Sequence, residues 1–118
     1  MGTSGSGRLA NYSPALEENV CENVIEKELL ENYGDYEYFK KALPLISVGN
    51  NIILKPEARI VAYDMSTGLS LGALSTQYEK IRRCFAQGYA FRGKVVEANN
   101  DGGIISIYVT IIGTKAKK

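Results

Sequence analysis

The chain has 118 residues, of which 45% are hydrophobic and 23% charged, and these values indicate one globular domain. It contains no histidine and two cysteines, which excludes Ser-His-Asp and Cys-His catalysis, histidine-bearing zinc sites and four-cysteine metal sites. The net charge of +1 is the sum of two unlike parts, because residues 1–37 carry −6 and residues 38–118 carry +7.

The N-terminal third of the chain is acidic and has a helical periodicity. Residues 1–7 (MGTSGSG) have the composition of an expression remnant and are set aside. Residues 8–34 are predicted to be an acidic amphipathic helix segment, whose helical periodicity covers residues 15–32, with Ser13 as the cap, Pro14 at the first helical position and Gly34 just past the end. Its apolar residues recur at spacings of three and four: Leu16, Val20, Cys21, Val24, Ile25 and Leu29. A single helix of this kind has to pack on the rest of the domain or on a partner.

Residues 35–113 are predicted to form a β-rich domain. Asp35 is expected to cap a short helix that ends near Leu43, although the alternation of Tyr36 and Tyr38 also fits the start of a strand. Beyond this helix, apolar runs alternate with turns that contain glycine and asparagine, which is the signature of antiparallel hairpins. The predicted strands cover residues 45–48, 52–54, 60–63 and 69–74.

A clear helix is predicted after the fourth of these strands. Ser75 or Thr76 caps it, and Gly88 ends it. The residues expected to face inward are Tyr78, Ile81, Cys84 and Phe85. No apolar run reaches the roughly 20 residues of a membrane span. No signal peptide is visible either, so we expect a reducing cytoplasm in which both thiols are free.

The last hairpin has strands at residues 90–98 and 104–112. A two-residue turn at Asp101-Gly102 would pair Val95 with Tyr108 and place basic residues among the isoleucines. A three-residue loop over residues 100–102 pairs Val95 with Ile107, and Lys94 with Tyr108. This second register is favoured, because it gathers the apolar residues on one face that the sheet can bury. The two faces are then Phe91, Val95, Ile105, Ile107, Val109 and Ile111 against Arg92, Lys94, Ser106, Tyr108 and Thr110.

The predicted fold class is α+β. It consists of a small bent antiparallel sheet or open β-barrel, with one helix inserted between strands and the N-terminal amphipathic helix docked outside. The chain is thus divided into the remnant at 1–7, the acidic helix at 8–34, the β-barrel-like domain at 35–113 and a basic tail at 114–118.

The sequence predicts no enzymatic activity. Residues 68–72 match the G-x-S-x-G pattern, but Ser70 lies in mid-strand and the chain has no histidine to activate it. Gly68 is better explained as closing a turn, and Gly72 as marking a bulge or a close contact. A solvated acidic face explains three glutamates at four-residue spacing better than a metal site does: Glu18, Glu22 and Glu26. No metal and no cofactor is therefore expected.

The basic residues of the C-terminal part favour a nucleic-acid partner. In the favoured register Arg92 and Lys94 share a strand face with Tyr108. Proteins hold single-stranded nucleic acid on such surfaces, because cations contact the phosphates and aromatic rings stack on the bases. The candidate flanking residues lie on the inserted helix: Lys80, Arg82 and Arg83. The alternative is an ordinary mixed surface over which the cations are spread.

Several short segments occur in the order that one known family shows. Leu54-Lys55-Pro56-Glu57 stands where that family has an L-x-R-E-P-like segment, and Leu71-Gly72-Ala73-Leu74-Ser75 where it has a G-x-L/I-P-type segment before a helix. Arg92-Gly93-Lys94-Val95-Val96 matches a G-x-V-V-type strand after the helix-ending Gly88. Through these segments residues 52–113 resemble the HIRAN family, and the resemblance implies a compact β-barrel with a DNA-related role.

The resemblance has one gap. The family has an N-P-x-D-x-N-A-I run between its second and third strands, and in eukaryotic members this region helps to form the pocket for the 3′ end of single-stranded DNA. In this chain Glu57-Ala58-Arg59-Ile60 crosses the gap directly. No pocket residue of the family is therefore carried over.

The sequence thus predicts a non-catalytic, cytoplasmic binding module that contacts single-stranded DNA or RNA through the basic strand face. The alternative function is a protein-interaction or self-association module, in which the helix over 8–34 binds a protein partner or a second copy. Neither interpretation involves a membrane.

Overall fold

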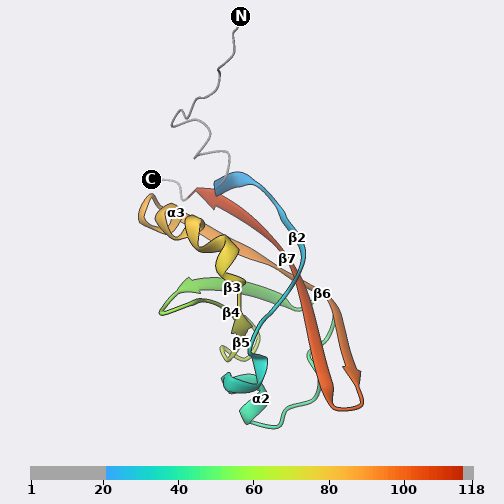
Figure 1. Ribbon diagram of the computed structural model, residues 1–118. Helices are drawn as coiled ribbons and strands as arrows, with labels where there is room; N and C mark the ends of the chain where they lie inside the picture. Colours follow the sequence, from blue (N-terminus) through green and yellow to red (C-terminus); the bar gives the residue numbers. More distant parts are fainter. Residues whose placement is uncertain (1–20, 116–118) are drawn as a thin grey trace, which may run out of the picture.

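The computed structural model describes residues 21–115, which contain a curled antiparallel sheet of six strands (Figure 1). The strands follow one another across the sheet in the order β2–β7–β6–β3–β4–β5. Their bounds are β2 (Ile25–Leu29), β3 (Asn51–Pro56), β4 (Ile60–Asp64), β5 (Ser70–Ala73), β6 (Tyr89–Asp101) and β7 (Ile104–Lys115). Strands β3, β4 and β5 confirm the predictions for 52–54, 60–63 and 69–74.

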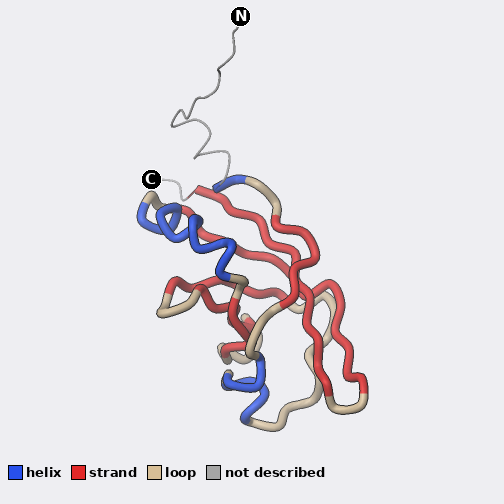
Figure 2. The backbone as a smooth tube through the Cα atoms, in the orientation of Figure 1, coloured by secondary structure: helices blue, strands red, loops and turns tan. Residues whose placement is uncertain are grey.

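Short helical segments lie at opposite ends of the sheet (Figure 2). The 3-10 turn η1 (Tyr33–Asp35) and helix α2 (Glu37–Lys40) occupy one end, and η2 (Thr76–Ile81) and α3 (Arg82–Ala86) the other. The predicted inserted helix is confirmed as the η2–α3 pair between β5 and β6. Ser75 caps it, because its side chain accepts a hydrogen bond from the Gln77 backbone N–H at 3.3 Å.

The sheet forms a half-barrel whose two edges touch at one point. Glu31, just past β2, and Ala73 of β5 exchange two backbone hydrogen bonds, of 2.7 and 2.8 Å. A side chain at Gly72 would obstruct this approach, because a Cβ there would lie 3.1 Å from the Glu31 carbonyl oxygen. The prediction of a small bent antiparallel sheet is confirmed, as is the close contact expected at Gly72.

The predicted amphipathic helix over 8–34 is wrong for its second half, where β2 forms instead. Ile25 pairs with Ile111 and is buried, whereas Val24 and Leu29 of the expected apolar stripe are 46% and 41% exposed. Strand β7 offers β2 a free row of backbone donors and acceptors, and this long-range pairing outweighs the local helical pattern. The first half of the prediction, residues 8–20, lies outside the described residues.

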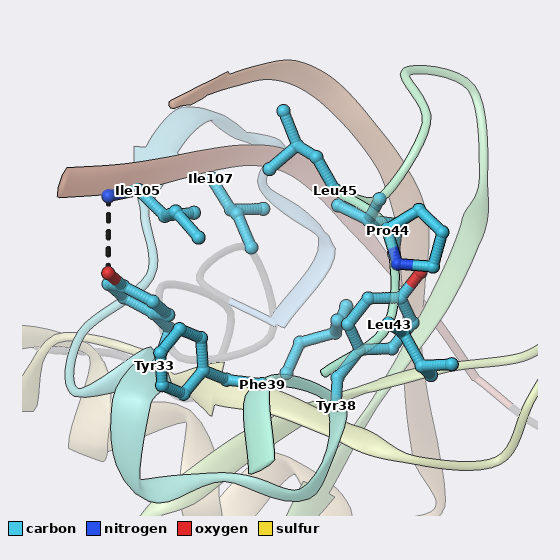
Figure 3. A pocket seen from close by; sticks show the side chains of 10 residues that line it. Tyr33, Tyr38, Phe39, Leu43, Pro44, Leu45, Ile105 and Ile107 are labelled. Atoms are coloured by element: carbon cyan, nitrogen blue, oxygen red, sulfur yellow. Dashed lines mark hydrogen bonds between the residues drawn. The ribbon is translucent and has the colours of Figure 1, made fainter. Parts of the chain in front are cut away.

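The segment between β2 and β3 also departs from the prediction. The expected helix from Asp35 to Leu43 is limited to η1 and the single turn α2, and residues 45–48 form a loop rather than a strand. Within that loop Ile46 alone is buried, at 2% exposure. The η1 turn is fixed to the sheet by the Tyr33 hydroxyl, which accepts a hydrogen bond from the Ile105 backbone N–H at 3.2 Å (Figure 3).

The register of the β6–β7 hairpin differs from both registers considered. Asp101 pairs with Ile104 around a two-residue Gly102-Gly103 turn, and both glycines have positive φ, as a type I′ turn requires. Val95 pairs with Val109, because a bulge at Val96 shifts the register along the strand. The predicted grouping of the apolar face is nevertheless confirmed: Phe91, Val95, Ile107, Val109 and Ile111 are buried, and Ile105 packs against them.

The prediction of two free thiols is wrong. Cys21 and Cys84 form a disulfide with a Cα–Cα distance of 5.7 Å, and both are 1% exposed. The pair joins the start of the described chain to α3 across a sequence separation of 63. Spacing along the sequence does not reveal such a pair, because Cys21 and Cys84 are brought together only by the tertiary fold.

Candidate nucleic-acid interface

The pairing of the strands defines an outer face of the sheet, opposite the core. Arg92 of β6 pairs with Ile112 on one side and Ile53 on the other, and Lys94 pairs with Thr110 and Asn51. Directly paired residues point to the same side of a sheet. The outer face therefore contains Asn51, Ile53 and Lys55 of β3, Tyr63 of β4, Arg92 and Lys94 of β6, and Tyr108, Thr110 and Ile112 of β7.

The outer face is hollowed at its centre by an open groove of about 400 Å³. Two of the predicted site residues, Arg92 and Lys94, line it, and Val96 and Ile112 add apolar surface with exposures of 39% and 47%. The full lining, here called the basic groove, is Asn51, Arg92, Gly93, Lys94, Val96, Thr110 and Ile112.

The cations of the basic groove are available for a ligand. Arg92 and Lys94 are both exposed, and among residues 21–115 neither side chain has an ion-pair or hydrogen-bond partner. The nearest pairing positions hold Thr110, Ile112 and Ile53, which are uncharged. An anion that enters the groove therefore meets two cations without first displacing a carboxylate.

Tyr108, the predicted aromatic partner, lies on the outer face but does not line the groove. The register places it opposite Glu97, not opposite Lys94. Lys27 of β2 lies over its ring, 5.6 Å from the centroid, and forms an ion pair of 2.8 Å with Glu97. The hydrogen bond between them raises the pKa of Lys27 and lowers the pKa of Glu97. A lysine thus lies over the Tyr108 ring, and its charge is already paired with Glu97.

A similar arrangement occupies the other side of the outer face, and the sequence did not predict it. Lys55 lies over the Tyr63 ring at 4.4 Å from the centroid. The Tyr63 hydroxyl donates a hydrogen bond of 2.5 Å to Glu57, and this bond raises the pKa of Tyr63 to about 12. Alternation along β3 could have placed Ile53 and Lys55 on one side of that strand, but it does not show that β3 pairs with β6 and so continues the face of Arg92.

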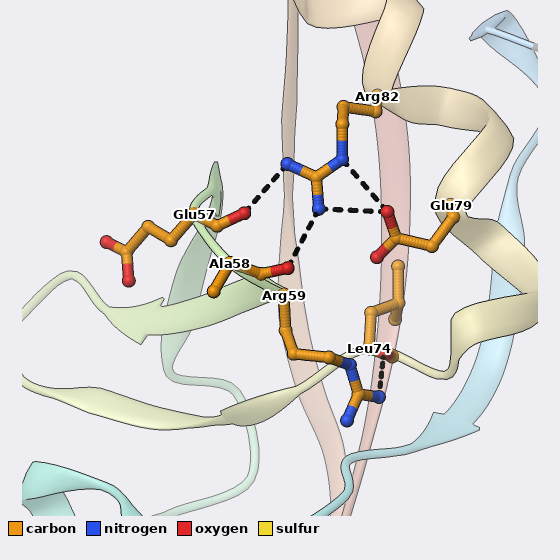
Figure 4. A network of polar contacts seen from close by, with 6 residues as sticks. All are labelled: Glu57, Ala58, Arg59, Leu74, Glu79 and Arg82. Carbon is orange, nitrogen blue, oxygen red and sulfur yellow. Dashed lines mark hydrogen bonds and ion pairs between the residues drawn. The ribbon is translucent and has the colours of Figure 1, made fainter.

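The side chain of Arg82, a predicted flanking residue, is bonded to other groups of the protein (Figure 4). Its guanidinium donates to a Glu79 carboxylate oxygen at 2.9 Å and to the Glu57 carbonyl at 2.7 Å, with a longer bond of 3.4 Å to the Ala58 carbonyl. Helix α3 is thereby attached to the β3–β4 turn. The basic charge of Arg82 is satisfied, so it does not extend the groove.

Arg59 completes a second set of contacts beside Arg82. It forms a 2.8 Å ion pair with Glu31 and donates to the Leu74 carbonyl at 2.8 Å. We call Arg59 and Arg82, with their carboxylate and carbonyl partners, the arginine junction.

The other two predicted flanking residues also lie apart from the groove. Lys80 lines a different cavity, of about 210 Å³, together with Val24, Glu26 and Ile81. Arg83 lies exposed on α3. None of the seven residues that line the basic groove comes from η2 or α3. The structure therefore brings Arg92 and Lys94 together and leaves Lys80, Arg82, Arg83 and Tyr108 outside the groove.

The remaining polar candidates have structural partners. Ser70 of the G-x-S-x-G pattern is 4% exposed, and its hydroxyl accepts a hydrogen bond from the Glu37 backbone N–H at 3.1 Å. It therefore positions α2 against β5. Over residues 21–115 no group of three or more His, Cys, Asp or Glu side chains is arranged to hold a metal ion. No helix in this part of the chain is long and apolar enough to span a membrane.

Comparisons with family models, with curated protein sequences and with solved structures give no match to this chain.

Proposed function

We propose that this protein is a non-catalytic module that binds single-stranded DNA or RNA in the basic groove. The observation that carries the proposal is the position of Arg92 and Lys94, two exposed cations without a carboxylate partner in the described chain, beside an open apolar hollow. A nucleic-acid strand has the complementary chemistry, because it joins anionic phosphates to flat apolar bases.

The two parts of the ligand would take different parts of the groove. Lys94 supplies a compact charge for a phosphate, whereas Arg92 offers a planar guanidinium that contacts a phosphate through two donors or stacks on a base. Val96 and Ile112 provide the apolar surface on which a base edge or face rests. Tyr108 and Tyr63 lie beside the groove, each with a lysine over its ring, and they would stack on a base only after that lysine moves.

A single strand suits this groove better than a duplex. Duplex-binding proteins that rely on charge make about 6 to 10 phosphate contacts, and the groove offers two free cations. The bases of a duplex are also stacked inside the helix, so they would not reach Val96 and Ile112.

Fluorescence anisotropy tests the proposal with the full chain and a labelled oligo-deoxythymidine strand of about 12 nucleotides. At low salt we expect binding that weakens as salt is added, because phosphate contacts release counterions. The double variant Arg92→Ala/Lys94→Ala should lose about tenfold or more in affinity. Its salt slope should also fall by about 1.4, since each phosphate contact on a single strand contributes about 0.7.

The matched control is Lys40→Ala/Lys41→Ala, which removes the same charge from exposed positions outside the groove. This variant should bind with nearly unchanged affinity. Absence of binding at low salt, or an equal loss in both double variants, would overturn the proposal. Stronger binding to the matching duplex would contradict the assignment to a single strand.

A further inference from the structure

A second hollow, which shares no lining residue with the basic groove, lies between α2, the loop that follows it and the hairpin (Figure 3). It is a small apolar pocket of about 30 Å³, and its walls include Tyr33, Phe39, Leu43, Leu45, Ile105 and Ile107. No charged side chain lines it. The apolar rim is open to solvent, because Phe39, Leu43 and Leu45 are 46%, 39% and 38% exposed.

The size of the pocket defines the kind of group that it accepts. Sites for small organic ligands enclose about 300 to 1,000 Å³, so this pocket is too small for them. It holds more than the 10–15 Å³ or so that one water occupies, which leaves room for the end of one aliphatic side chain. A protein segment that inserts a leucine or valine fits this description.

The charges beside the pocket define what should flank that side chain. Lys40 and Lys41 directly follow Phe39, and both are exposed. Among the described residues neither lysine side chain has an ion-pair or hydrogen-bond partner. An aliphatic anchor followed by carboxylates is therefore complementary to this surface.

A segment of that composition exists in this chain, outside the described residues. Residues 15–20 read ALEENV, so that Leu16 is followed at once by Glu17 and Glu18. We propose that the pocket binds Leu16 of a second copy of this chain, with Glu17 and Glu18 pairing with Lys40 and Lys41.

The point at which the segment leaves the domain favours a second copy over the same chain. Cys21 is held by its disulfide to Cys84, and its carbonyl packs against Gly113, where a Cβ would collide with it. Along β7, Ile107 and Ile105 lie six and eight residues from Gly113, which is about 20 to 26 Å. Leu16 precedes Cys21 by five residues, a reach of about 18 Å when fully extended.

Docking in the same chain would thus require the segment to be fully stretched along β7. Docking on a second copy carries no such restraint, and two copies can exchange segments reciprocally around a two-fold axis. One anchor and two ion pairs make a small contact compared with the ~1,600 Å² of a standard interface. We therefore expect weak, salt-sensitive self-association.

Sedimentation velocity of the full chain over a concentration series up to about 1 mM tests the inference. The wild-type protein should show a reversible monomer–dimer equilibrium. Leu16→Asp should abolish it, and Lys40→Glu/Lys41→Glu or Glu17→Lys/Glu18→Lys should each weaken it about tenfold or more. The combination of both charge reversals should restore association, which no general loss of folding explains.

The control variant is Lys55→Glu, a charge reversal at an exposed lysine on the outer face, which should dimerise as the wild type does. A monomer at every concentration, or a dimer that survives Lys40→Glu/Lys41→Glu, overturns the inference. Concentration-independent NMR shifts at Ile105 that vanish in Leu16→Asp would show docking in the same chain and would also overturn it. Because Arg92→Ala/Lys94→Ala should leave self-association intact, this test is independent of nucleic-acid binding.

Discussion

Both the basic groove and the arginine junction contain arginine, but the side chain is unpaired in the groove and bonded to the protein in the junction. Arg92 projects from β6 into an open hollow, where the described chain offers it no carboxylate or carbonyl partner. Arg82, ten residues earlier, donates to Glu79 and to two carbonyls of the β3–β4 turn. The comparison teaches that the number of cations in a sequence says little about binding. The partners that the fold supplies decide which cations remain available.

Loss of the disulfide should have the largest effect on stability. It also tests the arginine junction, because the disulfide holds α3, the helix that begins at Arg82. Cys84 lies in α3, next to the helix start from which Arg82 emerges. Closing a loop of 63 residues corresponds to about 4 kcal/mol in the chain-entropy account of disulfides. Cys21→Ser/Cys84→Ser should therefore unfold at clearly lower urea concentration than the oxidised wild type.

Reduction of the wild-type protein with dithiothreitol should produce the same loss, and the double variant should not respond to the reductant. Equal unfolding free energies for the oxidised and reduced wild type would contradict a stabilising role for the disulfide.

The second prediction concerns the groove and its one glycine. A Cβ at Gly93 would collide with the backbone carbonyl of Thr110 on β7, so β6 and β7 approach too closely for any side chain there. Gly93→Ala should destabilise the protein by about 2 to 3 kcal/mol in urea unfolding.

Gly34→Ala is the matched control, because nothing lies within 4 Å of a Cβ at that position. The control should stay within about 0.5 kcal/mol of the wild type. Similar unfolding curves for the two variants would show that β6 and β7 separate easily at Gly93.

The two arginines provide the most direct form of the comparison. Arg82→Ala removes an ion pair and hydrogen bonds to two carbonyls, and we expect a loss of about 1 to 2 kcal/mol in unfolding free energy. Arg92→Ala should change the unfolding free energy by less than about 0.5 kcal/mol, while it weakens binding of the oligonucleotide. The opposite pattern, with a stable Arg82→Ala and an unstable Arg92→Ala, would mean that the roles have been assigned to the wrong residues.

The smallest effect is a change in titration at the edge of the outer face. The hydrogen bond to Glu57 raises the pKa of Tyr63 to about 12, above the value of about 10 for a free tyrosine. The stabilisation from this bond is fully present below about pH 10 and is lost as the pH rises toward 12. Glu57→Gln should bring the pKa of Tyr63 back toward 10, as followed by carbon NMR of the ring. Glu97→Gln, on the other side of the face, should leave it unchanged.

Much of the sheet was predictable because its signals are local. Short apolar runs between turn residues located β3, β4 and β5, and alternation along the long hairpin placed Arg92 and Lys94 on one exposed face. The segment that forms β2 was predicted as a helix because apolar residues at spacings of three and four also occur in a strand that contains an irregularity. In β2 that irregularity is Lys27, whose φ is 46° and where the register with β7 shifts.

Of the residues predicted for the candidate site, only Arg92 and Lys94 line the basic groove. Tyr108 was placed beside Lys94 because the three-residue loop was preferred, whereas the Gly102-Gly103 turn and the bulge at Val96 moved it opposite Glu97. Lys55 and Tyr63 were missed because their proximity to Arg92 depends on β3 pairing with β6 across the sheet. No local pattern contains that information.

Local patterns were enough to assign which residues of β6 and β7 face the core and which face solvent, because alternation has a period of two and needs no distant partner. The turn at Gly68 and the helix end at Gly88 were also recognisable locally, since glycine at positive φ acts on its own neighbours. The tertiary structure alone decided the register of β6 on β7, the Cys21–Cys84 pair and the partners that hold Arg59 and Arg82. Each of these joins groups that are distant in the sequence, and their proximity is set by the curl of the whole sheet.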